Sequence, residues 1–212
     1  REKVAYAADA FAAMKIMAGA ALPPAKPARA VKTMQAAAAG VSPVAPPEPP
    51  FLGTRVVRWQ LEEILPLLDK RVLVKARWRM RPGARAEQFL AETLATLSER
   101  GIGGFSAVYG YFSCRRSGKN GLEIASGAGK EVFAFPRRSN RSLADYFSPD
   151  DDVAPLFIVS CGEALASLER ELFASDQYSR YLLLHGLGAE LAETLAAAMH
   201  GRIRRELGLG AR

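Results

Sequence analysis

Residues that bind metals or form disulfides are scarce: the 212 residues include only two cysteines and two histidines. Cys114 and Cys161 lie far apart, and no signal peptide is recognisable at the N-terminus, so free thiols in a reducing compartment are expected. The spacing of these cysteines, His185 and His200 matches no metal-ligand pattern. The sequence therefore predicts no metal site in this chain.

Long hydrophobic runs are also missing. No stretch reaches about 18 consecutive apolar residues, and the most apolar N-terminal segment is interrupted by Asp9 and Lys15. The sequence therefore predicts no membrane-spanning helix. Signatures of nucleotide binding and of serine hydrolases are absent as well: we find no Walker A sequence, no Gly-x-Gly-x-x-Gly after a strand and no Gly-x-Ser-x-Gly elbow.

The net charge of +7 is spread thinly. Residues 1–50 hold six basic and three acidic side chains, which leaves +4 for the other 162 residues. A nucleic-acid module needs aromatic residues interleaved with its basic ones, and the most basic segment offers only Trp78. A nucleic-acid partner is therefore not expected.

Three zones follow one another along the chain. Residues 1–22 are typical of a short strand followed by a helix, a unit too small to bury its own apolar face. Residues 23–50 contain eight of the thirteen prolines and predict a semi-rigid linker. Residues 51–212 have the composition of the main domain.

Hydrophobic periodicity in the main domain predicts strands early and long helices late. We expect helices at 60–68, 86–100, 162–173 and 177–207, and strands at 71–80, 106–114, 122–125, 131–135 and 154–160. Gly186 and Gly188 are the candidate point of a break in the last helix. The fold class is α+β, with a largely antiparallel twisted sheet packed against long helices.

The segment 71–80 is the most concentrated source of positive charge. Its alternation predicts a strand with Trp78 on the core side and Lys75, Arg77 and Arg79 on the wet side. These cations are either a docking face for an acidic partner or a solvated strand face. Arg137, with Arg138 and Arg141, is a second basic cluster, expected in a loop.

Several short segments occur in an order that resembles a known family. They are PFLGTR at 50–55, LEEILPLLD at 61–69, VYGYF at 108–112, LEI at 122–124, FPR at 135–137, LADYF at 143–147, and LHGL, LAE and HGRIRRE within 178–208. Their order and spacing are similar to the activation (reactivation) domain of cobalamin-dependent methionine synthase. ADAF at 8–11, with Met14 and Met17, resembles the last strand–helix unit of the preceding cobalamin-binding domain.

This resemblance implies a methyltransferase, 5-methyltetrahydrofolate–homocysteine S-methyltransferase, of which this fragment is not expected to turn over alone. It implies that the domain uses S-adenosylmethionine to methylate oxidised cobalamin reductively. Cobalamin would be held mainly by the upstream domain of the same chain, and zinc elsewhere in the parent enzyme. It further implies a flavodoxin-type electron donor, for which Lys75, Arg77 and Arg79 are the candidate docking residues, and a cytoplasmic location.

By match to the family, Asp69 and Glu193 would bind S-adenosylmethionine, and no catalytic side chain is implied. Lys70 departs from the aromatic residue usual after the aspartate, and Ser113 departs from a proline. The family's main ligand-binding segment follows its long helix, so we expect weak or no S-adenosylmethionine binding by residues 1–212 alone. The alternative is a stand-alone activator of corrinoid proteins with the same fold that does not bind S-adenosylmethionine.

Overall fold

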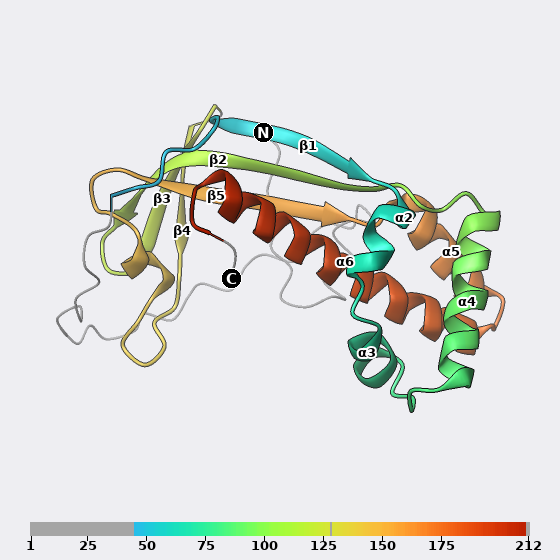
Figure 1. Cartoon of the computed structure of the whole chain (residues 1–212). Coiled ribbons are helices and arrows are strands. Elements are labelled where there is room, and N and C mark those ends of the chain that lie inside the picture. Colours follow the sequence, from blue (N-terminus) through green and yellow to red (C-terminus); the bar gives the residue numbers. More distant parts are fainter. Residues whose placement is uncertain (1–44, 128, 211–212) are drawn as a thin grey trace. The chain divides into compact units, whose positions relative to one another are not determined.

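The computed structural model describes residues 45–127 and 129–210, so the strand–helix unit and most of the linker expected at 1–50 lie outside the described residues (Figure 1). The strands are β1 (Gly53–Trp59), β2 (Phe105–Ser117), β3 (Gly121–Ser126), β4 (Gly129–Ala134) and β5 (Asp152–Ser160). The longer helices are α4 (Ala84–Glu99), α5 (Glu163–Ala174) and α6 (Tyr178–Glu206). The short helical segments are α2 (Leu61–Ile64), 3-10 turns at Leu65–Leu67 and Leu143–Tyr146, α3 (Lys70–Val72) and a π-helix at Leu73–Arg77. The α+β class is confirmed.

The sheet is antiparallel and organised around β2, a strand of 13 residues. The first part of β2 lies between β1 and β5, with Val108 opposite both Val56 and Ile158. The last part of β2 pairs with β3, which in turn pairs with β4. One long strand therefore belongs to both a three-stranded layer and a hairpin extension.

The C-terminal half of α6 covers one face of this sheet. Met199, Ile203 and Leu207 form a core with alternate β2 residues, of which Tyr109 and Tyr111 are almost fully buried. Both tyrosine hydroxyls donate to the carboxylate of Glu206, at 2.9–3.2 Å, and Arg202 Nε donates to it at 2.7 Å. Burial alone would raise the pKa of Glu206, but these donors outweigh it and lower that pKa. An ionised carboxylate therefore fastens the end of α6 to the sheet.

The N-terminal half of α6 packs into a second core at the helical end of the domain. This core joins α6 to α4, α5, α2 and the π-helix, and its most buried members include Leu73, Leu97, Leu187, Leu191 and Leu195. Gly188 admits α5 closely, because a Cβ there would lie 3.2 Å from Leu165 Cδ2. Gly186 admits Trp78 in the same way, so both glycines are sites of close packing.

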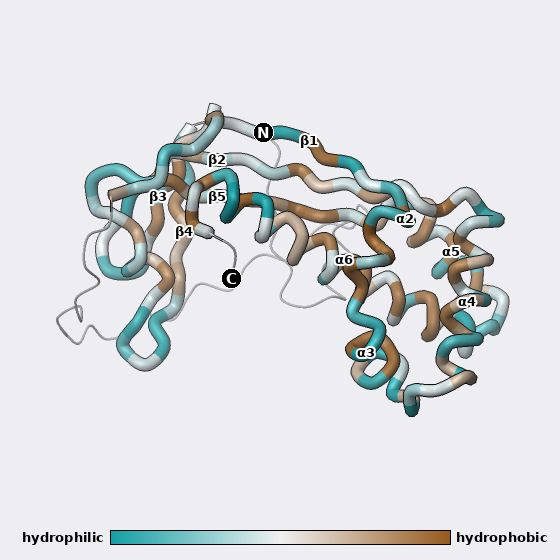
Figure 2. The backbone as a smooth tube through the Cα atoms, viewed as in Figure 1, coloured by the Kyte–Doolittle hydropathy of each residue, from teal (hydrophilic) through white to brown (hydrophobic). Residues whose placement is uncertain are grey.

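The opposite face of the sheet is left open in the described part of the chain. Val56, Val108 and Ile158 are register partners on that face, and their side chains are 54%, 45% and 75% exposed. Figure 2 accordingly shows β5 as largely hydrophobic although only one of its faces is covered. By length and composition alone α6 could cross a membrane, but half of its most apolar window is buried inside the domain.

Two sequence-based predictions need correction, and one strand was not predicted. The strand expected at 71–80 is wrong, because this segment forms α3 and the π-helix, followed by an irregular turn. The break expected near Gly186 and Gly188 is wrong as well, because α6 runs unbroken through both. The sequence did not predict a strand at Gly53–Trp59. This segment forms the edge strand β1, and its Val57 and Trp59 are partly buried against the core beneath the sheet. The remaining helices and strands are confirmed within a few residues.

Replacing Gly186 with alanine tests the close approach of Trp78 to α6. The new Cβ would lie 2.8 Å from Trp78 Cδ1, so we expect G186A to lower the free energy of unfolding by about 1–3 kcal/mol, measured by urea denaturation. Gly201→Ala is the matched control, because its nearest neighbour is the flexible end of Arg205 at 3.5 Å. Alanine at that position should gain up to about 1 kcal/mol of helix propensity. Equal stabilisation by both changes would contradict the packing described here.

Candidate functional site

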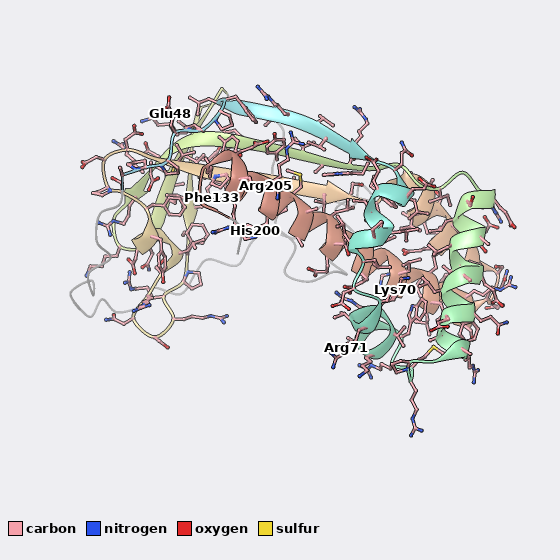
Figure 3. The ribbon with its side chains drawn as sticks, in the orientation of Figure 1. Glu48, Lys70, Arg71, Phe133, His200 and Arg205 are labelled. Atoms are coloured by element: carbon pink, nitrogen blue, oxygen red, sulfur yellow. The ribbon has the colours of Figure 1, made fainter. Side chains whose placement is uncertain are left out.

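Asp69 begins the helical segment that carries most of the candidate site. Its Oδ1 accepts hydrogen bonds from the backbone N–H groups of Arg71 and Val72, both at 2.9 Å, so it is the N-cap of α3. Asp69 is exposed to solvent. Figure 3 shows Lys70 and Arg71, which follow it, on α3 at the helical end of the domain. The aspartate thus has a local structural role, and its charge remains open to solvent.

In the π-helix that follows, Leu73–Arg77, the backbone hydrogen bond spans one residue more than in an α-helix. Trp78 N–H donates to the carbonyl of Leu73 at 2.9 Å, the i to i+5 bond of such a turn. This geometry buries Leu73, Val74 and Trp78 and directs the indole N–H of Trp78 to the carbonyl of Leu183 in α6, at 2.9 Å. Single π turns occur frequently at functional sites.

Arg77 links this π-helix to the middle of α6. Its Nε donates to Glu190 at 2.9 Å, and its guanidinium also lies 3.8 Å from the carboxylate of Glu193. The Glu190 side chain is 6% exposed, whereas that of Glu193 is 69% exposed. Arg77 therefore mainly compensates the buried charge of Glu190, and the Glu193 carboxylate stays largely exposed to solvent.

The structure places the two residues expected to bind S-adenosylmethionine on elements that pack together. Asp69 precedes α3, and Glu193 lies on α6 beside the π-helix. Within residues 45–127 and 129–210, no hydrogen bond or ion pair joins them. Sequence reasoning missed Glu190, whose only signal was its position three residues before Glu193 on the same helix, facing a partner 113 residues away.

The expected docking residues are also rearranged. Lys75, Arg77 and Arg79 are exposed, but they lie on and after the π-helix instead of on one strand face. Arg77 is occupied by its two glutamates, so Lys75 and Arg79 are the cations left for a partner. The φ angle of Arg79 is +52°, in the left-handed region that non-glycine residues rarely adopt.

The second basic cluster turns out to be partly structural. Arg137 forms an ion pair with Asp145 at 2.6 Å and donates to two backbone carbonyls, which ties the FPR segment to the LADYF segment. The Ser142 backbone N–H, then Arg137, lower the pKa of Asp145. Arg138 and Arg141 pair with each other through backbone hydrogen bonds in an isolated β-bridge, and both side chains are exposed.

The two cysteines and two histidines do not form a candidate catalytic or metal site. Burial raises the pKa of Cys114 to about 12 and that of Cys161 to about 11, so both stay protonated near neutral pH. His185 is exposed, with Nδ1 3.5 Å from Glu169 and its ring stacked on Tyr181. His200, labelled in Figure 3, is exposed on α6. In the described ranges, no three His, Cys, Asp or Glu residues are grouped closely enough to hold a metal ion.

Comparison with known proteins gives a consistent answer, although no family model matches the chain. The chain is 33% identical to methionine synthase of Mycobacterium tuberculosis (strain ATCC 25618 / H37Rv) and 31% identical to that of Mycobacterium leprae (strain TN), in each case over 74% of its length. A crystal structure of the MetH reactivation domain bound to AdoHcy superposes with a TM-score of 0.64 at 20% identity, over 76% of this chain. Over 74% of its length the chain is therefore homologous to one region of methionine synthases, and its fold is that of the solved reactivation domain.

The match covers part of each relative. This chain spans 16% of the length of the two mycobacterial methionine synthases and 58% of the solved reactivation-domain chain. The identity with methionine synthases therefore concerns one region of a much longer enzyme.

Removing Arg77 tests its role as the partner of a buried carboxylate. We expect Arg77→Ala to lower the free energy of unfolding by about 2 kcal/mol, because Glu190 would stay buried without a counter-charge; partial exposure of Arg77 reduces the full cost of a broken buried pair. Arg170→Ala, which breaks the exposed pair with Glu163, should change it by less than about 1 kcal/mol. Urea denaturation at neutral pH measures both.

A double variant separates charge from packing. Arg77→Ala with Glu190→Leu lacks the arginine stem as R77A does but removes both charges, so it should recover most of the stability lost in the single variant. If the double variant is as unstable as R77A, lost packing of the arginine stem explains the effect and the buried pair does not.

Proposed function

We propose that this chain is part of the reactivation domain of a cobalamin-dependent methionine synthase, where it takes part in S-adenosylmethionine-dependent reductive methylation of oxidised cobalamin. The observation that carries the proposal is the 31–33% identity with methionine synthases over 74% of the chain, in a region with the fold of the MetH reactivation domain. The parent enzyme would make methionine from homocysteine and methyltetrahydrofolate in the cytoplasm.

The chemistry of Asp69 and Glu193 suits the cationic part of S-adenosylmethionine. Both carboxylates are exposed, and carboxylates form strong charge-assisted contacts with an ammonium group and favour a nearby sulfonium. Asp69 Oδ1 caps α3, which fixes the carboxylate, and Oδ2 makes no hydrogen bond or ion pair with any residue that the structure describes. The solved reactivation domain was crystallised with AdoHcy, which supports a ligand of this class here.

When bound, S-adenosylmethionine supplies the methyl group, and the protein's task is to hold and orient it. Asp69 and Glu193 would do so from segments that are anchored in one core, since Leu68 precedes Asp69 and Leu191 lies near Glu193 in α6. Cobalamin would be bound mainly by an upstream domain whose last unit is residues 1–22, joined through a linker at 23–50. Zinc would belong to another part of the parent enzyme.

The alternative of a stand-alone corrinoid-protein activator is less favoured. The relatives that match at 31–33% identity are methionine synthases, which favours the methionine synthase assignment over a stand-alone activator. A flavodoxin-type protein remains the proposed electron donor, because Lys75 and Arg79 offer positive charge to an acidic surface.

Neutralising the two carboxylates in the full-length methionine synthase tests the ligand site. We expect Asp69→Asn and Glu193→Gln each to weaken S-adenosylmethionine binding by about tenfold, the loss of one charge-assisted contact, and to slow reactivation while primary turnover is unchanged. Asparagine can still cap α3, so D69N changes charge without removing the cap. Binding is measured by calorimetry and reactivation by recovery of activity.

Glu99→Gln provides the control, since Glu99 is an exposed carboxylate at the end of α4. It should leave binding and reactivation as they are. If D69N and E193Q behave like this control, these two residues do not belong to the ligand site.

Reversing the free cations tests the donor surface. We expect Lys75→Glu with Arg79→Glu to weaken docking of a flavodoxin-type donor by at least tenfold at low salt, with the difference shrinking as salt is raised. Reversal of Arg138 and Arg141 changes the charge equally in a different loop. Reduction kinetics measured across a salt series decide the matter, and equal effects of the two double reversals would reject a specific surface.

A further inference from the structure

A groove beside the π-helix shares Arg79 with the proposed donor surface, but its other lining residues take part in none of the proposed steps. It has a volume of about 900 Å³ and lies between the segment 76–80, the start of α4 and the N-terminal half of α6. This volume is within the range of small-molecule sites, about 300–1,000 Å³. The proposal developed from it does not depend on S-adenosylmethionine binding.

The floor of the groove is apolar and partly aromatic. Trp78 packs so closely against α6 that residue 186 has no room for a Cβ atom. Its indole N–H already donates to the backbone carbonyl of Leu183. Met80, Phe89 and Leu182 complete the apolar lining, and the Leu182 side chain is 63% exposed. An exposed leucine beside aromatic rings is a suitable surface for a planar apolar body.

The charged lining of the groove is cationic. It consists of Arg77, Arg79 and Arg85, the neutral polar lining adds Ser179, His185 also lines the groove, and no aspartate or glutamate does. Arg77 is neutralised by Glu190 and Glu193. Arg79 and Arg85 make no ion pair with any residue that the structure describes, and the Arg85 guanidinium lies 5.5 Å from the centre of the Phe89 ring. Two guanidinium groups thus remain uncompensated at one cavity.

Backbone strain at Arg79 supports a functional role. Its φ of +52° costs on the order of 1 kcal/mol for a side chain of this kind, yet no glycine occupies the position. The turn keeps Arg79 in the groove wall directly after Trp78. Strain of this kind often accompanies binding sites, where the geometry of a side chain is used.

We propose that this groove binds a phosphate monoester with a planar apolar body. A phosphate monoester carries about −1.5 to −2 charges at neutral pH, which matches the two unpaired arginines, and guanidinium groups bind phosphate oxygens in bidentate fashion. The planar body contacts the exposed Leu182 and the partly buried Phe89, beside the largely buried Trp78. The phosphate group and the planar apolar body together define the ligand class.

Calorimetry with 1-naphthyl phosphate on the whole chain tests the proposal. The phosphate ester should bind at least tenfold more tightly than either 1-naphthol or inorganic phosphate. Arg79→Gln with Arg85→Gln should weaken it at least tenfold, whereas Arg138→Gln with Arg141→Gln, the same loss of charge at exposed loop residues, should not. Leu182→Glu should also weaken it, and its exposed position leaves the core untouched.

Each other outcome overturns the proposal. Equal affinity for the ester and inorganic phosphate would show an adventitious ion only, and equal affinity for the ester and 1-naphthol would show an apolar patch without anion recognition. Displacement of the probe by S-adenosylmethionine would place it in the site of Asp69 and Glu193. Lys75→Glu distinguishes this groove from the donor surface, because Lys75 is outside the groove lining and should affect docking alone.

Discussion

One helix of 29 residues belongs to two cores, and the rest of the fold depends on how it does so. Along α6, buried residues recur every fourth position from Leu187 to Leu207. A step of four residues advances about 40° beyond a full turn, so five such steps rotate the buried stripe by roughly 200°. The stripe therefore faces the helical core at one end and the sheet at the other, and α6 fixes the relation between the two.

This rotation explains where the polar residues of α6 can lie. At the sheet end, Glu206 is enclosed by two tyrosines and Arg202, and its carboxylate holds the helix terminus in place. In the middle, Glu190 turns inward toward Arg77 while Glu193, three residues later, stays outside. Buried charge on a central helix is tolerated only with such partners, so Arg77 and Arg202 are structural necessities before they are functional candidates.

Much of the fold could be predicted from periodicity, and the failures have physical causes. The helix α4 and strands β2 to β5 follow their patterns because each has one covered face. The segment 71–80 alternates in sequence, but its buried residues are Leu73, Val74 and Trp78. Leu73 and Trp78 are five residues apart, the spacing that the hydrogen bond of a π turn joins. Gly186 and Gly188 were interpreted as helix breakers because sequence does not reveal the neighbours that need their missing side chains. Asp69 and Glu193 came from family resemblance, and no local pattern predicted the Arg77–Glu190 pair.

The π-helix also separates two kinds of surface chemistry. Asp69 precedes it and Glu193 lies beside it, and both are exposed carboxylates suited to a cationic ligand. Arg79 follows it with Arg85, and both are exposed cations suited to an anionic ligand. Arg77 lies between the two sets and is paired with Glu190, so it adds little net charge to either side. Without that pair the carboxylates would face an uncompensated arginine, and a cation would be bound less well. The buried pair therefore lets one short turn of backbone present exposed carboxylates on one side and exposed arginines on the other.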